Sequence, residues 1–446
     1  MKIPKILLGV SAAFFLLFVF SCGKDAQSTR SPSAFPPDIS GTASESAFDD
    51  FAWETFIALV WPANDQNTGA DTSRGIPDTN DYTTLWETYE ETYDIYTRGP
   101  SDPAPIPDIC PEPPGGKLRA HRQIMKVGIS TEFIEAAMDP VNRGPLIDLN
   151  RNFVRYEVLY NSTLTEYVAN NRLFSKQGLI DFPGDSLDYT DGSLVVKAAW
   201  KVLAGADSSK DFFTSQSYMI YLQDTLKDST GNIIAQDTAY CNLAEVGLVG
   251  FHIAWKTPNH PNWIWMTFEH EDNAPPMAEH AFSHPYNFFD SSRGVDTSIV
   301  NHHPDYAPEK TYYNPAWSQS QTPAQIMRVL SIRSDVEAAN RRYHARSPIQ
   351  GSIWENYRLI GVQWTHSTLG ATPFVVQPDT FLANVSLETF EQGSASCMGC
   401  HQLNTGLVMS PDSTKTMSAN YMWSAFKALK QDPTENQAGA EKTEGQ

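Results

Sequence analysis

Residues 246–255 read VGLVGFHIAW, and residues 263–270 read WIWMTFEH. Both runs consist mainly of apolar, β-branched and aromatic residues, and the stretch between them contains two prolines. A run of this composition that ends in turn-forming residues is typical of a β-strand. Runs of the same kind occupy residues 193–203 and 217–222. Short strands at this spacing predict an antiparallel sheet or sandwich.

Further strands and helices are predicted on either side of these runs. The sequence favours strands over residues 153–160 and 357–364. Helical spacing of apolar residues begins at Ser46, which with Asp49 resembles a capping box, and ends at Pro62. Other helices are expected along the aromatic stripe Trp86, Tyr89, Tyr93 and Tyr96, after Ser162 or Thr163, and from Thr322 to Tyr343. The pattern predicts an α+β fold, with a large antiparallel β-rich domain and flanking helices.

A short cysteine motif near the C-terminus indicates a cofactor. Residues 397–401 read CMGCH, a C-x-x-C-H sequence that is typical of covalent attachment of a c-type haem. On one helical turn, Cys397 and Cys400 present both sulfurs to the same side, where they can form thioethers with the two vinyl groups of a porphyrin. His401 then points at the iron as the proximal ligand. We therefore expect one covalently bound haem c.

Two other uses of a Cys-x-x-Cys pair fit this chain less well. A thioredoxin-like redox pair needs a strand before its helix and a second strand soon after, and here the chain nearly ends. A zinc knuckle needs two more ligands at close spacing, and no Cys or His follows His401.

The C-terminal segment resembles a c-type cytochrome over about residues 380–430. The resemblance implies a helix over Leu382–Gln392 before the motif and a closing helix over Ala419–Leu429. Class I cytochromes have a longer stretch between these parts, which ends in a ligating methionine. Here that stretch is short, so this small helical segment needs the upstream domain to cover the haem. The whole chain, with FAWETF at 51–56, TFEHEDN at 267–273 and SCMGCH at 396–401, also resembles large bacterial cytochrome c family proteins.

The sixth ligand of the iron has three candidates, His252, His270 and Met417. Strand alternation places His252 on the face of Leu248 and Ala254, and His270 on the face of Met266 and Phe268. Histidine is a common metal ligand, but a histidine on an apolar face is more often a core residue with satisfied hydrogen bonds. The methionines at 409, 417 and 422 are the ones that follow the motif.

The functions that the sequence allows differ in what occupies the sixth position of the iron. A Met or His in that position leaves no site for a substrate, and the protein is then an electron carrier. An open position would favour a haem enzyme of the peroxidase or oxidase kind. A third alternative is a β-rich binding domain with the haem as its electron outlet. The sequence contains no Ser-His-Asp, phosphate-loop or paired-carboxylate signature for other chemistry.

The N-terminus has the features of an export signal. Lys2 and Lys5 precede an apolar run that ends near Phe20, and this run is too short for a membrane span. The sequence VFSC at 19–22 resembles a bacterial lipobox, which implies lipid on Cys22 and a place in the cell envelope, periplasmic or on the outer membrane. The alternative is an ordinary signal peptide with a free Cys22. The expected segments are a signal peptide (1–21), a flexible tether (22–45), a large α+β domain (46–375), the cytochrome c-like segment (376–430) and a disordered tail (431–446).

The chain is acidic, and it contains two further cysteines, Cys110 and Cys241. The formal net charge is -20 and becomes -22 once residues 1–21, with two lysines and no acid, are removed. An acidic surface disfavours nucleic acid and suits a basic redox partner protein. Cys110 and Cys241 are candidates for a disulfide in an oxidising compartment, and both the paired and the free state stay open.

Overall fold

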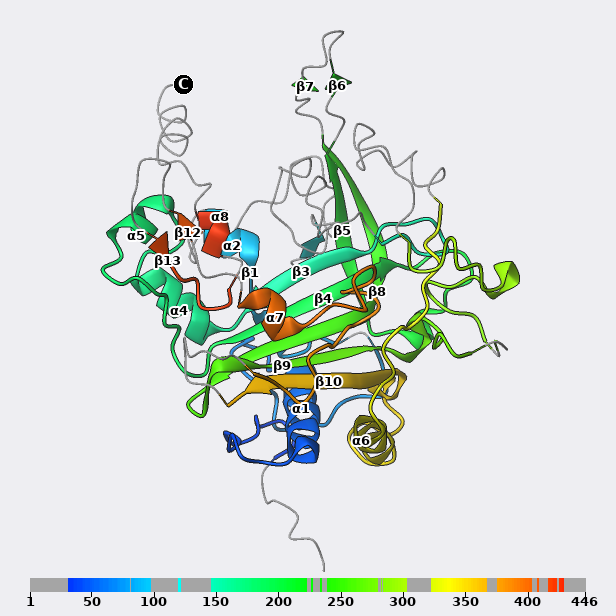
Figure 1. The fold of residues 1–446 in the computed structure, drawn as a ribbon, viewed down its shortest axis with the longest axis horizontal. Coiled ribbons are helices and arrows are strands. Elements are labelled where there is room, and N and C mark those ends of the chain that lie inside the picture. Colours follow the sequence, from blue (N-terminus) through cyan, green and yellow to red (C-terminus); the bar gives the residue numbers. More distant parts are fainter. Residues whose placement is uncertain are drawn as a thin grey trace, which may run out of the picture. The chain divides into compact units, whose positions relative to one another are not determined.

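A nine-stranded, mostly antiparallel sheet is the framework of the protein (Figure 1). The computed structural model describes residues 31–80, 82–97, 119–121, 146–222, 226–227, 233–234, 239–279, 282, 284–302, 322–366, 375–402, 407–408, 416–422 and 425–428. The chain divides into two units after Ser31, and the unit from Pro32 onward contains the sheet and its helices. The strands are β1 (Glu90–Glu91), β2 (Arg119–His121), β3 (Arg155–Tyr160), β4 (Leu194–Val202), β5 (Thr214–Leu222), β8 (Ala239–Thr257), β9 (His260–His270), β10 (Tyr357–Thr365) and β11 (Val376–Gln377).

The sheet has the order β1-β3-β4-β8-β9-β10-β11, and β5 pairs with both β8 and β2. Only the short contact between β2 and β5 is parallel among the described strand pairs. Two hairpins lie outside the sheet, β6 (Leu226–Lys227) with β7 (Ile233–Ile234), and β12 (Leu407–Val408) with β13 (Thr416–Met417). The strands predicted at 153–160, 193–203, 217–222, 246–255, 263–270 and 357–364 are confirmed as β3, β4, β5, β8, β9 and β10, and the α+β class is confirmed with them.

The helices are short apart from two that pack together. They are α1 (Glu45–Val60), α2 (Thr92–Thr97), α4 (Ser162–Asn170), α5 (Lys176–Asp181), α6 (Ser334–His344), α7 (Cys397–His401) and α8 (Ala425–Ala428). The 3-10 turns are η1 (Trp86–Thr88), η2 (Ser209–Asp211), η3 (Glu271–Asn273), η4 (Ser291–Arg293) and η6 (Ile353–Asn356). The cap of α1 is Ser44, whose hydroxyl accepts from the amide of Ala47, so the predicted cap at Ser46 is wrong.

One face of the sheet packs against α1 and α6. Phe56 of α1 stacks on Phe268 of β9 with ring centroids 4.2 Å apart, and Trp53 donates from its indole nitrogen to Asn340 of α6 at 3.0 Å. We call this apolar layer, which includes Phe251, Ile253, Ile264, Met266 and Phe268, the α1-side core. Burial of each of these side chains contributes about 1.5–3 kcal/mol.

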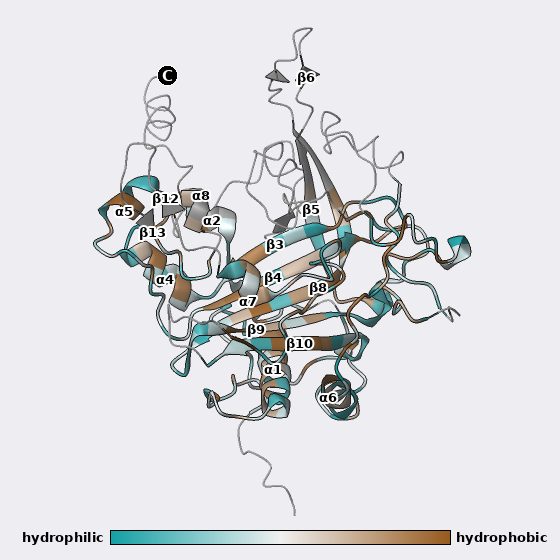
Figure 2. Cartoon of the chain, viewed as in Figure 1, coloured by the Kyte–Doolittle hydropathy of each residue, from teal (hydrophilic) through white to brown (hydrophobic). Residues whose placement is uncertain are grey.

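The other face carries a second apolar layer. It includes Ala254, Trp265, Met398, Met417 and Met422, and we call it the α7-side core. Because both faces of the central strands are covered, these strands are apolar along most of their length (Figure 2). This burial explains why the runs at 246–255 and 263–270 lack a regular polar alternation.

The predicted helix from Thr322 to Tyr343 is wrong in its first half. Helix α6 begins only at Ser334, and the preceding residues are extended. The amides of Ala324, Ile326 and Arg328 donate to the carbonyls of Ile147, Phe288 and Pro275 at 3.0, 2.8 and 2.8 Å. Since alternate amides are bound by other segments, they are not available for helical hydrogen bonds.

The aromatic stripe at 86–96 is not one helix either. It forms η1, β1 and α2 in turn, and β1 pairs with β3 at the edge of the sheet. Trp86 belongs to the α1-side core and Tyr96 to the α7-side core. The aromatic residues therefore serve both faces of the sheet, which a single helix on one face could not do.

The helices that the cytochrome resemblance implied are largely absent from the described C-terminal residues. Residues 385–394 form turns, so the predicted helix over Leu382–Gln392 is wrong. The closing helix is reduced to α8, because Asn420 and Tyr421 have φ values of 46° and 68°, which a right-handed helix excludes. Among the described residues of this segment, the predicted helical character is found in α7 and α8.

Several predictions fall on residues outside the described part of the chain. These are the signal peptide, the lipid site at Cys22, Cys110, Met409 and the tail from residue 431. Cys241 lies on β8, and its pairing with Cys110 stays a prediction. Among the described helices, none has both the length and the hydrophobicity needed to cross a membrane.

Candidate haem-attachment site

The C-x-x-C-H motif forms the short helix α7, which lies over the sheet (Figure 1). The hydroxyl of Ser396 caps the helix by accepting from the amide of Gly399 at 3.1 Å. Met398 is fully buried in the α7-side core, whereas Cys397 is half-buried and Cys400 is exposed. Neither cysteine is in a disulfide. The helix therefore turns Met398 inward and leaves the cysteines where a porphyrin can reach them.

The imidazole of His401 is held by one backbone hydrogen bond. Its Nδ1 lies 2.7 Å from the carbonyl oxygen of Tyr421. A carbonyl can only accept, so Nδ1 carries the proton and Nε2 keeps its lone pair. Metal-ligating histidines usually donate their other ring N–H in this way, which fixes both the tautomer and the ring orientation.

Burial keeps this imidazole neutral. It lowers the pKa of His401 to about 4, and the electrostatic effects of Lys197 and His252 act in the same direction. The hydrogen bond to Tyr421 opposes this shift but does not cancel it. A histidine must be deprotonated to bind a metal, so His401 is ready to act as a ligand at neutral pH.

Trp265 of β9 packs directly on His401. The two ring centroids are 4.3 Å apart with an interplanar angle of 45°, and the ring of Tyr421 lies 6.4 Å from that of Trp265. The indole nitrogen of Trp265 donates to the carbonyl of Asn262 at 3.3 Å, which limits rotation of the indole. The motif at 397–401 contains no signal for this contact, and Trp265 was not among the predicted site residues.

His252 lies on the same face of the sheet as His401. Its Nε2 is 3.2 Å from Oε2 of Glu388, but the contact lacks the alignment of a hydrogen bond. The prediction that His252 and Leu248 lie on the same face of the sheet is wrong, because Leu248 belongs to the α1-side core. Trp200 and Ala199 pair with Leu248 and Gly250, so Val249 forms a β-bulge that reverses the side-chain alternation.

His270 is not brought to this site. It follows Met266 and Phe268 on the α1 side of the sheet, and its ring stacks on Phe212 with centroids 4.6 Å apart. Its Nε2 lies 2.8 Å from the carbonyl oxygen of Asp211, and its Nδ1 accepts from the amide of Asp272 at 3.2 Å. Both ring nitrogens are therefore engaged in hydrogen bonds, on the opposite face from His401.

Met417 is brought to the α7 side. It lies on β13, is fully buried and shares the α7-side core with Met398 and Met422. Of the three predicted candidates for the sixth ligand, the structure therefore places His252 and Met417 on the face that carries α7.

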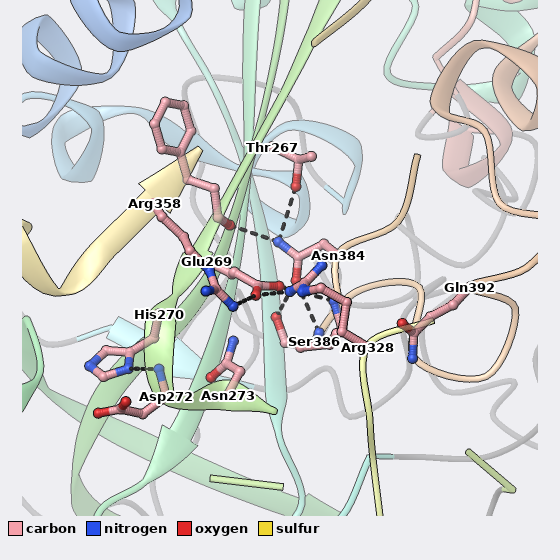
Figure 3. A network of polar contacts seen from close by, with 12 residues as sticks. Thr267, Glu269, His270, Asp272, Asn273, Arg328, Arg358, Asn384, Ser386 and Gln392 are labelled. Carbon is pink, nitrogen blue, oxygen red and sulfur yellow. Dashed lines mark hydrogen bonds and ion pairs between the residues drawn. The ribbon is translucent and has the colours of Figure 1, made fainter. Parts of the chain in front are cut away.

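Buried polar contacts hold the residues before α7 against the sheet (Figure 3). Asn384 donates to the hydroxyl of Thr267 and the carbonyl of Phe268 at 3.0 and 2.7 Å. Glu269 accepts from Arg328, from Arg358 at 3.2 Å and from the amide of Val385 at 3.1 Å. The sequence motifs did not reveal this network, which joins the C-terminal segment to β9.

The residues of the site fit a covalent haem. No group of three or more His, Cys, Asp or Glu side chains that could hold a metal ion occurs among the described residues. A haem does not need such a group, because the porphyrin supplies the in-plane nitrogens and the protein only the axial ligands. Two thiols outside disulfides, one half-buried and one exposed, and the neutral His401 are the side chains that this chemistry requires.

Comparisons with protein-family models, with curated proteins and with solved structures found no significant match to this chain.

Proposed function

We propose that the protein is a membrane-anchored, monohaem c-type cytochrome that carries electrons in the bacterial cell envelope. One observation carries the proposal: the C-x-x-C-H helix leaves Cys400 exposed and Cys397 half-buried, both outside disulfides, while the Nδ1–H of His401 donates to Tyr421. A free Cys-x-x-Cys pair has no need of a neutral, oriented histidine directly after it. The segment 376–430 carries the haem in this proposal, and the large domain 46–375 covers it.

The residues around the motif suit a carrier. When bound, the haem supplies one-electron chemistry at its iron. His401 is the proximal ligand, Cys397 and Cys400 hold the porphyrin, and the buried Met398 excludes water beneath the helix. Burial and the axial ligands are the main factors through which a protein sets the reduction potential of a haem.

The proposed location rests on the expected lipid anchor, and the proposed partner rests on the net charge of the chain. Lipid on Cys22 would fix the protein to a membrane through the tether at 22–45. The mature formal charge of -22 favours a basic redox partner protein, with an association rate that falls as ionic strength rises. Replacing Cys22 with Ala should move the protein from the membrane fraction to the soluble fraction.

A haem enzyme is the second candidate. The observation in its favour is the pair formed by His252 and Glu388, which lies on the same face of the sheet as His401. A histidine beside a carboxylate can act as a general base or acid for a peroxide-like substrate, provided that the sixth position of the iron is open.

Visible spectra of the oxidised and reduced protein test the proposal. The protein should be exported in a strain that matures cytochromes c, and haem should remain on the chain in acidified solvent. A low-spin spectrum that carbon monoxide and peroxide leave unchanged is the expected result for a carrier. A high-spin spectrum that shifts with either ligand would favour the enzyme, and a chain without haem would refute both.

A further inference from the structure

Side chains from two neighbouring strands contact the two ends of α7. Trp265 of β9 and Gln363 of β10 are directly opposite each other in the antiparallel register. Opposite residues in such a pair point to the same face, with their Cβ atoms about 4.5–5.5 Å apart. Trp265 packs on His401 at the C-terminal end of the helix, and Gln363 contacts its N-terminal end.

Gln363 connects two parts of the C-terminal segment. Its Oε1 accepts from the hydroxyl of Ser396 and the amide of Met398, both at 3.3 Å. Its Nε2 donates to the carbonyls of Asp379 and Thr380 at 2.9 and 3.2 Å. The side chain is fully buried, and these four contacts use both donors and both acceptor lone pairs of the amide.

The helix cannot hold its own position. It has five residues. An isolated helix of this length is unstable, because the unfavourable free energy of nucleation exceeds the stabilisation that its few hydrogen bonds provide. Its direction relative to the sheet must therefore come from tertiary contacts. Among the described residues, contacts that join α7 to the sheet and to the C-terminal chain include those with Gln363 at one end and with Trp265 and Tyr421 at the other.

We propose that Gln363 and Trp265 are positioning residues that fix the C-x-x-C-H helix and set the ring plane of His401 toward the haem iron. The part of the inference that concerns the iron rests on the proposed function, and the part that concerns the helix does not. Neither residue belongs to the motif.

A matched control separates positioning from general stability. Gln392 is also a buried glutamine of the C-terminal region. It accepts from the amide of Val329 and donates to the carbonyls of Met327 and Thr389 at 2.9, 3.0 and 3.1 Å, without contact to α7. Gln363→Met and Gln392→Met therefore remove the same amide from equally buried sites.

Hydrogen exchange of the mature chain, made without haem attachment, tests the helix directly. In Gln363→Met, exchange of the amides at 397–402 should rise by about tenfold relative to the unaltered chain, because the hydrogen bonds that hold this turn are lost. In Gln392→Met, exchange there should stay within about twofold of the unaltered chain. Equal exchange in the two variants would overturn the proposal.

Electron paramagnetic resonance of the haem-loaded protein tests the ring plane. Gln363→Met and Trp265→Leu should shift the g-values, whereas Trp265→Phe, which keeps an aromatic ring against His401, should restore them toward the original spectrum. Unchanged g-values together with faster exchange would show that Gln363 and Trp265 hold the helix without setting the ring plane of His401. That result would overturn the part of the proposal that concerns the iron. Absence of haem from the unaltered protein would refute the proposed function, and the exchange experiment would still decide the role of Gln363.

Discussion

Ser386 lies against Gly250 so closely that a Cβ on residue 250 would overlap the Ser386 hydroxyl. That hydroxyl donates to Oδ1 of Asn384 at 2.7 Å, and both residues are completely buried. Glycine in the interior of β8 thus lets the C-terminal segment reach the backbone of the sheet. The contact is a second anchor for this segment, upstream of the one that Gln363 provides.

Gly250→Ala should therefore destabilise the protein by about 1–3 kcal/mol, the range expected for overpacking in a tight interior. The free energy of unfolding, measured by urea denaturation, gives the effect. Gly393→Ala is the control, since a Cβ at residue 393 meets nothing within 4 Å. A cost at residue 250 no larger than that at 393 would contradict the close approach.

Glu269→Gln should be among the most damaging single changes in the protein. Glu269 is fully buried and accepts from the guanidinium groups of Arg328 and Arg358. Removing one partner of a buried ion pair typically costs about 3–5 kcal/mol, because a buried charge is left uncompensated. Glu337→Gln, which breaks the exposed 3.9 Å pair with Arg341 on α6, should cost less than about 0.5 kcal/mol. Similar denaturation midpoints for the two variants would argue against a buried pair.

Replacement of the candidate sixth ligands should separate them by spectrum. His252→Ala and Met417→Leu should be made singly in the haem-loaded protein, and at most one of them should convert the low-spin iron to high spin. His270→Leu should leave the spectrum unchanged and lower stability, because His270 lies on the α1 side with both nitrogens bonded. A spectral change in His270→Leu would show that the iron is on the other face.

The two cysteines of α7 should each supply one thioether. Cys397→Ala or Cys400→Ala should leave haem attached through a single bond, and the double variant should release all haem into acidified acetone. Haem staining after denaturing electrophoresis measures the covalent fraction. Covalent haem in the double variant would refute the attachment site, whereas Cys241→Ala should retain full staining.

Asp49 should give the protein a pH-dependent stability. Burial, helped by the charge of Asp335, raises the pKa of Asp49 from 3.8 to about 7. The folded state then binds a proton that the unfolded state loses, so this group lowers the free energy of unfolding as pH rises from about 4 to about 7. Asp49→Asn should match the original protein near pH 4 and exceed it in stability at pH 8. A constant difference between the two proteins from pH 4 to pH 8 would contradict the raised pKa.

The sequence predicted what depends on local composition. The strands β3, β4, β5, β8, β9 and β10 were found because β-branched and aromatic residues concentrate between turn residues, whatever lies on either face. The helical turn of the C-x-x-C-H motif is also local, whereas its cap at Ser396 was not predicted. These features do not depend on which distant segments meet.

The parts that sequence reasoning missed depend on contacts between distant residues. The residues before α6 are extended because their amides donate to the carbonyls of Ile147, Phe288 and Pro275. The periodicity of this segment gives no indication of these hydrogen bonds. The bulge at Val249 reversed the predicted face of Leu248 relative to His252. Gly247 and Gly250, inside a strand pattern, were the signals that could have indicated a bulge or a close backbone approach.

The position of the motif in the chain has a consequence for the order of assembly. Every strand that receives α7 or its preceding residues, from β8 to β10, comes before Cys397 in the sequence. During synthesis from the N-terminus, these strands are complete before the cysteines emerge. The strand face that receives α7 can therefore form while the motif is still undocked. His401 can bind the carbonyl of Tyr421 only after these later residues have been made, so α7 reaches its full set of contacts late in the assembly of the fold.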